Sequence, residues 1–182
     1  MRVITGKARG AKLLTLEGES VRPTSEKTKE AVFSAIQFDI EGRRVLDLFA
    51  GSGQLGLEAL SRGAERCVFI DSSAEALEVV KQNVKKTGFE KQAVISRMDY
   101  SQFLMGTKEV FDIAFIDPPY AAGFTVPALE GVSKIMSDYG IIVCEHAADV
   151  EVPDVVGGFK LSRQYKYGKL VTVTIYKKED SE

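Results

Sequence analysis

The chain has 182 residues, of which 45% are hydrophobic and 27% charged, so its composition is that of a globular domain and excludes a mainly disordered, collagen-like or coiled-coil chain. The formal net charge of −2 does not by itself indicate a nucleic-acid-binding protein. No apolar run is as long as a membrane span, and the N-terminus lacks the apolar core of a signal peptide. We therefore expect a cytoplasmic protein with no membrane partner. Its cysteines, Cys67 and Cys144, lie in apolar runs and are expected to be buried free thiols.

The N-terminal residues predict two short strands, at 2–5 and 12–16, joined by a glycine-containing turn into a basic β-hairpin. We treat residues 1–20 as this extension and residues 21–182 as the main domain. Apolar side chains at helical spacing then predict a helix through residues 31–36.

From residue 43 onward, strand and helix patterns alternate. We expect strands at 45–49, 67–70, 93–96, 111–116 and 140–144, with helices at 54–62, 74–86 and 127–136. Two further segments, 160–167 and 169–176, alternate in polarity and meet at Gly168, which predicts an antiparallel hairpin. The pattern predicts an α/β fold: a mostly parallel seven-stranded sheet with helices on both faces.

Basic side chains concentrate near the two ends of this fold. Residues 1–16 carry four basic side chains and no acidic one, and residues 159–178 carry six and no acidic one. Such ends can form a patch that binds a polyanion, but lysines near strand ends also block edge-to-edge pairing. The charges alone leave both interpretations open.

A glycine-rich segment follows the first strand of the alternating pattern. Gly51, Gly53 and Gly56 have the G-x-G-x-x-G spacing, which fits dinucleotide sites, nucleoside-cofactor sites and some purely structural turns. Asp47 ends the strand four residues before Gly51, where its carboxylate would repel a pyrophosphate. An acid there suits a cationic group, and S-adenosylmethionine offers both an ammonium and a sulfonium.

Acidic residues also end the next two strands. Asp71 can accept hydrogen bonds from both hydroxyls of a ribose, although it can equally cap the helix that follows. Asp99 can accept from an adenine amino group while Met98 packs on the ring, and a plain loop acid is an equally open interpretation.

The sequence Asp-Pro-Pro-Tyr at residues 117–120 directly follows an apolar strand. Pro118 and Pro119 stiffen the backbone and lack N–H donors, while their carbonyls remain as acceptors. With the Asp117 side chain and the ring of Tyr120, this arrangement can accept two hydrogen bonds from a planar amino group and stack on its ring. The alternative is a proline turn that happens to end in a tyrosine.

Residues 47–56 resemble the first motif of class I adenosylmethionine-dependent methyltransferases, and residues 117–120 resemble the (Asn/Asp)-Pro-Pro-(Tyr/Phe) motif of those that methylate exocyclic or amide nitrogens. With the segments at 2–10 and 22–33, essentially the whole chain resembles the RsmD family. Its members methylate the exocyclic N2 amine of one guanine in bacterial 16S ribosomal RNA.

The resemblance implies a Rossmann-like fold, S-adenosyl-L-methionine as cofactor, and 16S rRNA as partner, within the small ribosomal subunit or an assembly intermediate. It implies catalytic roles for Asp117, Pro118, Pro119 and Tyr120. It implies cofactor contacts for Asp47, Phe49, Ala50, Gly51, Gly53, Asp71, Ser72, Met98 and Asp99. It implies RNA contacts for Lys7, Arg9, Lys12, Arg22 and Thr24. We expect a monomer and no metal site.

Several other functions fit part of the sequence. An N6-adenine methyltransferase acting on DNA or RNA, or a protein glutamine methyltransferase, would use the same Pro-Pro motif. An NAD-dependent oxidoreductase would use the glycine motif but leaves Asp47 and residues 117–120 unexplained. A non-catalytic RNA-binding module on a methyltransferase fold is disfavoured because the motifs are intact.

Overall fold

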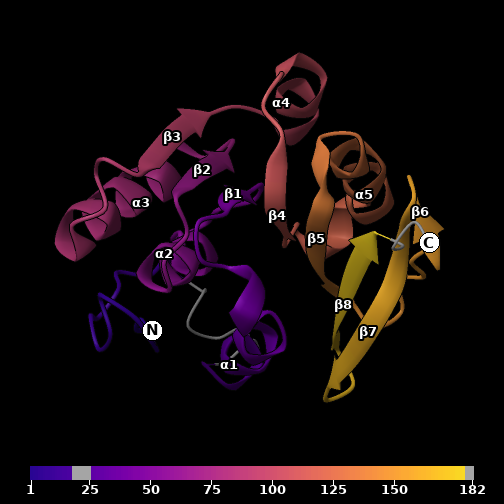
Figure 1. The fold of residues 1–182 in the computed structure, drawn as a ribbon, viewed down its shortest axis with the longest axis horizontal. Coiled ribbons are helices and arrows are strands. Elements are labelled where there is room, and N and C mark those ends of the chain that lie inside the picture. The colour runs from indigo at the N-terminus through magenta and orange to yellow at the C-terminus, as the bar shows by residue number, and fades with distance from the viewer. Residues whose placement is uncertain (18–25, 179–182) are drawn as a thin grey trace.

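The computed structural model describes residues 1–17 and 26–178. Its strands are β1 (Arg44–Asp47), β2 (Arg66–Asp71), β3 (Ala93–Arg97), β4 (Phe111–Ile116), β5 (Met136–Ala147), β6 (Val155–Val156), β7 (Phe159–Tyr167) and β8 (Val171–Lys178). They form one sheet in the order β3-β2-β1-β4-β5-β8-β7-β6, parallel from β3 to β5 and antiparallel beyond (Figure 1). The predicted α/β fold with its closing antiparallel hairpin is confirmed.

The helices cover both faces of the sheet, as expected. They are α1 (Glu26–Ala35), α2 (Gln54–Ser61), α3 (Ala74–Thr87), α4 (Tyr100–Gly106) and α5 (Thr125–Ser133), with short 3-10 turns η2 (Gln37–Asp39) and η3 (Tyr120–Ala122). Buried side chains of α1, α2 and α3 form one apolar core against the sheet, and α4 and α5 form a second core on its other face. None of the described helices is long and apolar enough to cross a membrane.

The described sheet has eight strands, so the expected number of seven was wrong. The additional strand, β6, has two residues and pairs antiparallel with the start of β7. The turn between them is Gly157-Gly158, with φ angles of 53° and 83° that side chains rarely adopt. A pair of glycines after two valines predicts such a hairpin, and this signal was missed.

Two helices also differ from the sequence prediction. Helix α5 ends at Ser133, before the predicted 136, because β5 begins at Met136 and pairs there with Phe111 of β4. Helix α4 was not predicted, since its seven residues are too few for a clear apolar period. The first difference arises from strand pairing between segments that are distant in the sequence, and the second from the short length of α4.

The predicted N-terminal hairpin is confirmed in its antiparallel pairing, with backbone hydrogen bonds from Val3 to Ala11 and from Leu13 to Met1, but the strands predicted at 2–5 and 12–16 are not formed. Residues 1–17 form a looped segment in which Arg2 and Lys12 make a single antiparallel bridge. Val3 and Leu13 are buried in the same core as α1, α2 and α3. The described part of the basic extension therefore packs as part of the main fold.

Buried polar groups attach this N-terminal segment to α2. The Glu58 carboxylate, which is fully buried, accepts hydrogen bonds from the backbone amides of Ile4 and Thr5 at 2.9 and 3.1 Å. The same carboxylate forms ion pairs with Lys29 and Arg62 at 3.2 and 2.9 Å. Because a buried charge without partners is costly, this network fixes the path of the segment over α2.

Candidate active site

A cavity of about 410 Å³ lies at the carboxyl ends of the parallel strands. It extends from the end of β3, across β2 and β1, to the end of β4, and includes the position between β1 and β4 where the strand order reverses. Ligands of open α/β sheets bind at such a position. Seven of the predicted cofactor residues line it, namely Phe49, Ala50, Gly51, Asp71, Ser72, Met98 and Asp99.

The three glycines of the motif, two in the loop between β1 and α2 and one in α2, serve different structural purposes. Gly51 and Gly53 have φ angles of 57° and 82°, a backbone conformation that glycine adopts without strain. A Cβ atom on Gly56 would lie 2.4 Å from the ring of Phe69 and 2.7 Å from Sγ of Cys67. The first two glycines therefore shape the turn, and the third lets α2 pack closely on β2. Gly51 lines the cavity, whereas Gly53, which was predicted to contact the cofactor, and Gly56 do not.

Asp47 is 1% exposed and does not line the cavity either. Its carboxylate accepts a hydrogen bond from the backbone amide of Gly56 in the first turn of α2, at 3.0 Å. A carboxylate at this end of a helix satisfies a free amide and interacts favourably with the helix dipole. In the structure, Asp47 therefore holds the start of α2 and the glycine loop before it.

Asp71 connects two loops around the cavity. Its Oδ2 accepts from the amide of Gly51 at 2.9 Å, and its Oδ1 accepts from the amide of Ser73 at 2.9 Å. Ser73 caps α3 by accepting from the amide of Ala76. Ser73, and not Asp71, is therefore the N-cap of α3. Asp71 supports the two loops and, as a carboxylate, keeps further lone pairs.

Asp99 caps α4 at the end of β3. Its Oδ1 accepts from the amides of Ser101 and Gln102 and from the Ser101 hydroxyl. The hydrogen bond from the Ser101 hydroxyl, followed by those from the amides, lowers the pKa of this exposed carboxyl below its ordinary value of 3.8. Met98 beside it is 37% exposed, which is typical of an apolar side chain available to a ligand.

An aromatic wall that the sequence analysis missed completes this side of the cavity. The ring of Tyr100 lies 5.1 Å from that of Phe49 and 4.9 Å from that of Phe124, measured between centroids. All three residues line the cavity. They come from the loops after β1, β3 and β4, so their proximity depends on the strand order and leaves no local signal in the sequence.

The Asp-Pro-Pro-Tyr sequence directly follows β4 at the other end of the cavity. Asp117 and Pro119 line the cavity, while Pro118 is buried. Tyr120 is 36% exposed and begins η3 outside the lining residues. Its hydroxyl donates to Oε1 of Glu145 at 2.8 Å. Glu145 lies on β5 and directly follows the predicted strand at 140–144, and this signal was missed.

The N-terminal segment also reaches the cavity, which the sequence analysis did not predict. Leu16 and Glu17 line it. The side chain of Asn83 on α3 fixes the backbone just before these residues. It accepts from the amide of Leu14 at 2.8 Å and donates to the Leu14 carbonyl at 2.9 Å. The same amide group donates to the Ser52 carbonyl of the glycine loop at 2.9 Å.

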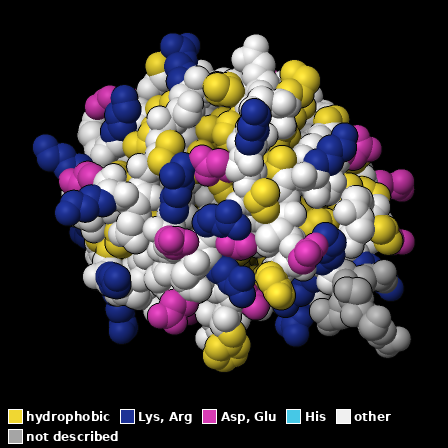
Figure 2. All heavy atoms as spheres, turned by 45° about the horizontal axis from the view of Figure 1, so that its top comes forward, with side chains coloured by type: hydrophobic (Ala, Val, Ile, Leu, Met, Phe, Trp, Pro, Cys, Tyr) yellow, Lys and Arg dark blue, Asp and Glu magenta, His cyan; other side chains and the backbone are white. Residues whose placement is uncertain are grey.

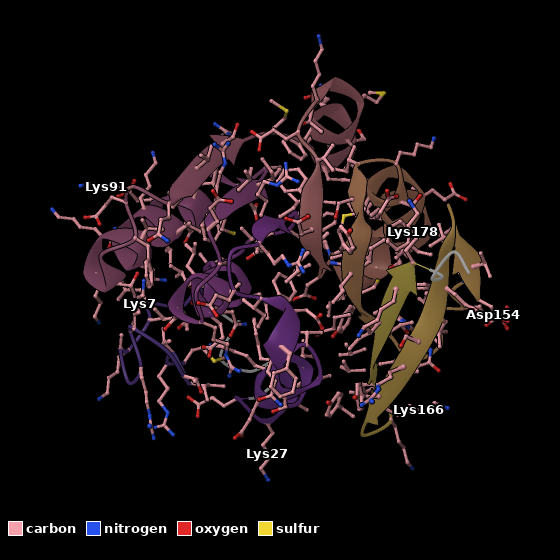
Figure 3. All side chains as sticks on the ribbon, viewed as in Figure 1. Lys7, Lys27, Lys91, Asp154, Lys166 and Lys178 are labelled. Atoms are coloured by element: carbon pink, nitrogen blue, oxygen red, sulfur yellow. The ribbon has the colours of Figure 1, made fainter. Side chains whose placement is uncertain are left out.

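Three of the predicted RNA-binding residues, Lys7, Arg9 and Lys12, are exposed on the N-terminal segment. Arg22 and Thr24 lie outside the described residues. In Figure 3, Lys7 lies on the left side of the molecule, Lys27 of α1 at the bottom and Lys166 of β7 at the lower right. On the face in Figure 2, Lys and Arg side chains lie among Asp and Glu side chains, so its charge is mixed. The three described residues are therefore accessible to a polyanion.

His146, the one histidine of the sequence, is 2% exposed on β5. Its Nδ1 donates to the Ala147 carbonyl, so Nε2 accepts from the Thr174 hydroxyl, each at 2.9 Å. Burial lowers the pKa of this imidazole below its ordinary value of 6.5. The ring is neutral and both nitrogens are used, so His146 is a structural residue. Burial likewise raises the pKa of the free thiols Cys67 and Cys144.

Comparison with known proteins gives consistent similarities. Residues 1–177 match the model of the family described as Conserved hypothetical protein 95. The chain is 41% identical to the YlbH protein of Bacillus subtilis (strain 168), over 98% of this chain and 99% of that protein. It is 30% identical to the protein named Ribosomal RNA small subunit methyltransferase D from Escherichia coli (strain K12), over 98% of this chain and 90% of that protein. The solved structure of the Escherichia coli protein yhhF matches with a TM-score of 0.87 and 28% identity, over 98% of both chains. These similarities include every strand end that lines the cavity.

Proposed function

The chain belongs to the RsmD family of methyltransferases, and from this membership we propose that it transfers a methyl group from S-adenosyl-L-methionine to the exocyclic N2 amine of a guanine in the 16S rRNA of the small ribosomal subunit. The observation that carries the proposal is the Asp-Pro-Pro-Tyr sequence at the end of β4, next to a nucleoside-sized cavity. The relatives named ribosomal RNA small subunit methyltransferase D support rRNA as the substrate over DNA.

The residues around the cavity fit adenosylmethionine. A volume of about 410 Å³ is within the ordinary range for small-molecule sites. Asp71 would accept from the ribose hydroxyls with the lone pairs that its backbone bonds leave. Met98, Asp99 and the aromatic wall would hold the adenine ring, and the loop from Phe49 to Gly53 would hold the methionine end.

When bound, adenosylmethionine supplies an electrophilic methyl group on a sulfonium sulfur. Asp47 would act on the cofactor without contacting it. It contributes negative charge near the glycine loop and holds that loop through its hydrogen bond from the amide of Gly56. The site therefore divides into groups that contact the cofactor and a buried carboxylate that positions them.

Guanine N2 is a poor nucleophile because its lone pair is delocalised into the ring. We propose that the Asp117 carboxylate and the Pro118 carbonyl accept the two N–H bonds of N2, so that the lone pair localises on nitrogen. N2 then forms its bond to the methyl carbon while the bond from that carbon to the sulfonium sulfur would break, which leaves S-adenosylhomocysteine. The proton that N2 loses would pass to Asp117 or to water. Asp117 thus contributes by orientation and by stabilising the positive charge that develops on N2.

A guanine in folded RNA must leave its stack to reach this position. Tyr120 offers a partly exposed ring against which the base can stack, and Glu145 fixes that ring through its hydroxyl. Lys7, Arg9 and Lys12 would contact phosphates, and their contribution would weaken as salt concentration rises. We further propose that Arg22 and Thr24 contact RNA, that the protein acts in the cytoplasm as a monomer, and that a protein-organised RNA within the small subunit is the substrate.

The test is methyl transfer from labelled adenosylmethionine to three acceptors: unmodified small ribosomal subunits, naked 16S rRNA and duplex DNA. We expect label in RNA, with subunits preferred over naked rRNA, and none in DNA. Label in DNA alone would overturn the assignment of the acceptor, whereas efficient labelling of naked rRNA would overturn only the subunit requirement. Cofactor binding measured in parallel by calorimetry shows whether an inactive preparation is folded.

A further inference from the structure

A second, smaller cavity of about 30 Å³ adjoins the first one. The two share Gln54, Leu55 and Asp117 in their linings. The rest of the small cavity belongs to α1, the ends of β4 and β5, and β8, with the lining residues Thr28, Lys29, Val32, Ile116, Val143, Glu145 and Val173. It therefore lies on the side of Asp117 that faces away from the predicted cofactor residues.

Glu145 lies beside Asp117 across two parallel strands. Ile116 of β4 pairs with Cys144 of β5, so the next residue on each strand is Asp117 and Glu145, respectively. Both side chains alternate with these neighbours and line the same small cavity. Two carboxylates thus lie next to each other at the carboxyl edge of the sheet.

The position of Glu145 is costly for a carboxylate. The residue is 8% exposed, and the same cavity is lined by the apolar residues Val32, Val143 and Val173 together with Thr28 and Lys29, whose ammonium pairs with Glu58. It accepts from the Tyr120 hydroxyl, and a carboxylate has capacity for further hydrogen bonds. A buried acid is retained at a site when a hydrogen-bond donor meets it there.

A third acceptor lies in the same place. Oε1 of Gln54 is buried, and among the described residues it has no hydrogen-bond donor. Gln54 begins α2 and lines both cavities. Unsatisfied buried acceptors are rare, so an acceptor of this kind at the junction of two cavities indicates that a ligand supplies the donor.

We infer that Glu145 accepts a hydrogen bond from N1–H of the target guanine and thereby selects guanine over other bases. The inference rests on the proposed function, because it takes N2 of the same base to be held by Asp117. Guanine presents N2–H and N1–H as adjacent donors along one edge. These two donors match two adjacent carboxylates, with Oε1 of Gln54 as an additional acceptor at the junction.

The same arrangement rejects adenine. With its N6 amine at Asp117, adenine would place the N1 lone pair toward the Glu145 carboxylate, and two acceptors would face each other. A site built to hydrogen-bond a substrate N–H discriminates strongly against an analogue without it, because its buried polar group is left unpaired. Glu145 therefore accounts for base selection, which the shared Pro-Pro motif does not provide.

The small cavity, at about 30 Å³, is much smaller than the cavity of about 410 Å³ that it adjoins. In the inference, only the N1 side of the ring enters it. The remainder of the base would lie at the mouth, near the ring of Tyr120. Tyr120 reaches Glu145 directly, which brings the stacking surface and the proposed N1 acceptor into one position.

The experiment replaces the target guanine by 2-aminopurine. This base keeps the exocyclic amine at C2, but its N1 is an acceptor and it lacks O6. The guanine that the wild-type protein methylates is mapped by mass spectrometry, and rRNA carrying either base there is prepared by ligation and assembled into subunits. The measured quantity is kcat/KM for methyl transfer to each base, for the wild-type protein and for Glu145→Gln.

We expect the wild-type protein to prefer guanine by about 100-fold, since a hydrogen bond to a charged group is lost. In Glu145→Gln the amide can rotate to donate to N1 of 2-aminopurine, so the preference should fall to within about threefold. The comparison of the two ratios cancels the difference in intrinsic reactivity between the two amines. An unchanged preference in Glu145→Gln overturns the inference.

Tyr120→Phe is the matched control, because it removes the hydrogen bond to Glu145 and keeps the ring. If Glu145 acted only by positioning Tyr120, Tyr120→Phe would lose the base preference to the same extent, and the inference would be wrong. We expect Tyr120→Phe to lower kcat/KM for both bases alike. If the wild-type protein transferred no methyl group to guanine, the proposed function itself would be wrong. This outcome differs from an unchanged base preference in Glu145→Gln, which overturns only the inference about Glu145.

Discussion

The two halves of the site hold their carboxylates in different ways. In the loops after β1, β2 and β3, which we call the cofactor half, Asp47, Asp71 and Asp99 each accept hydrogen bonds from backbone amides of the loops themselves. In the acceptor half, defined as the loop after β4 with the end of β5, Glu145 accepts from a side chain, the Tyr120 hydroxyl. We propose that the acids of the first half support the loops that bind the cofactor, whereas those of the second half contact the methyl acceptor.

This difference separates the expected effects of substitutions. In the cofactor half, removal of a carboxylate should weaken cofactor binding and folding together, because the same atoms serve both. In the acceptor half, removal should stop methyl transfer while cofactor binding and stability change little. Each prediction below tests whether this separation holds.

The largest effect is expected for Asp117→Ala. Loss of the acceptor for guanine N2 should lower kcat about 10²–10³-fold, by analogy with removal of one preorganised group that stabilises a transition state. The dissociation constant for adenosylmethionine should stay within about threefold, measured by calorimetry. Asp117→Asn is the matched control: it keeps an oxygen acceptor and should retain part of the activity. Near-wild-type turnover in Asp117→Ala would refute the role of Asp117.

The converse result is expected for Asp71→Ala in the cofactor half. The substitution removes the acceptor of the Gly51 and Ser73 amides, two hydrogen bonds to a charged group, and should cost about 3 kcal/mol of stability. For a protein of this size that lowers Tm by about 6–12 °C. The cofactor dissociation constant should rise at least about tenfold in the same protein. A variant with weakened binding and an unchanged Tm would show that the two roles of Asp71 are separable.

Asn83→Ala tests whether the N-terminal segment belongs to the cofactor half. The Asn83 side chain is fully buried and bonds both Leu14 and the Ser52 carbonyl, so its loss should cost about 2 kcal/mol. Because Leu16 and Glu17 line the cavity, cofactor binding should weaken by about three- to tenfold. Gln82→Ala, at an exposed neighbouring position on α3, is the control and should change neither quantity.

The smallest effect concerns His146, next to Glu145 on β5. Its pKa is lowered in the folded state, so the unfolded chain binds more protons as pH falls below the ordinary value of 6.5, and stability must decline with falling pH. Between pH 7.5 and 5.5 the loss is at most about 1.4 kcal/mol. Urea unfolding at several pH values measures it, and His146→Gln should flatten this part of the profile. A wild-type profile that rises toward pH 5.5 would contradict a neutral imidazole.

The sequence predicts those parts of the molecule whose signals are local. The alternation of strands and helices, the glycine turn and the Asp-Pro-Pro-Tyr sequence all follow from neighbouring residues, and the fold that they predict is confirmed. Helix α4 and the two-residue strand β6 were missed because short elements carry weak patterns.

The remaining features depend on contacts across the fold. The bond from Asp47 to Gly56, the aromatic wall and the approach of Glu145 to Asp117 each depend on strand order and register. Glu145 is an acid that follows an apolar run, and the pairing of β5 with β4 is what brings it beside Asp117. The predicted cofactor residue Asp47 illustrates the same limit: its position in the sequence is correct for the loop, yet its side chain lies outside the cavity.

The most direct test of the account is the identity of the methylated nucleoside. Small-subunit RNA treated with the wild-type protein and adenosylmethionine is digested to nucleosides and analysed by liquid chromatography and mass spectrometry. We predict N2-methylguanosine, formed about 10²–10³-fold more slowly when Asp117→Ala replaces the wild-type protein. N6-methyladenosine in its place would retain the fold and the cofactor half but would contradict the guanine-N2 assignment of the acceptor half.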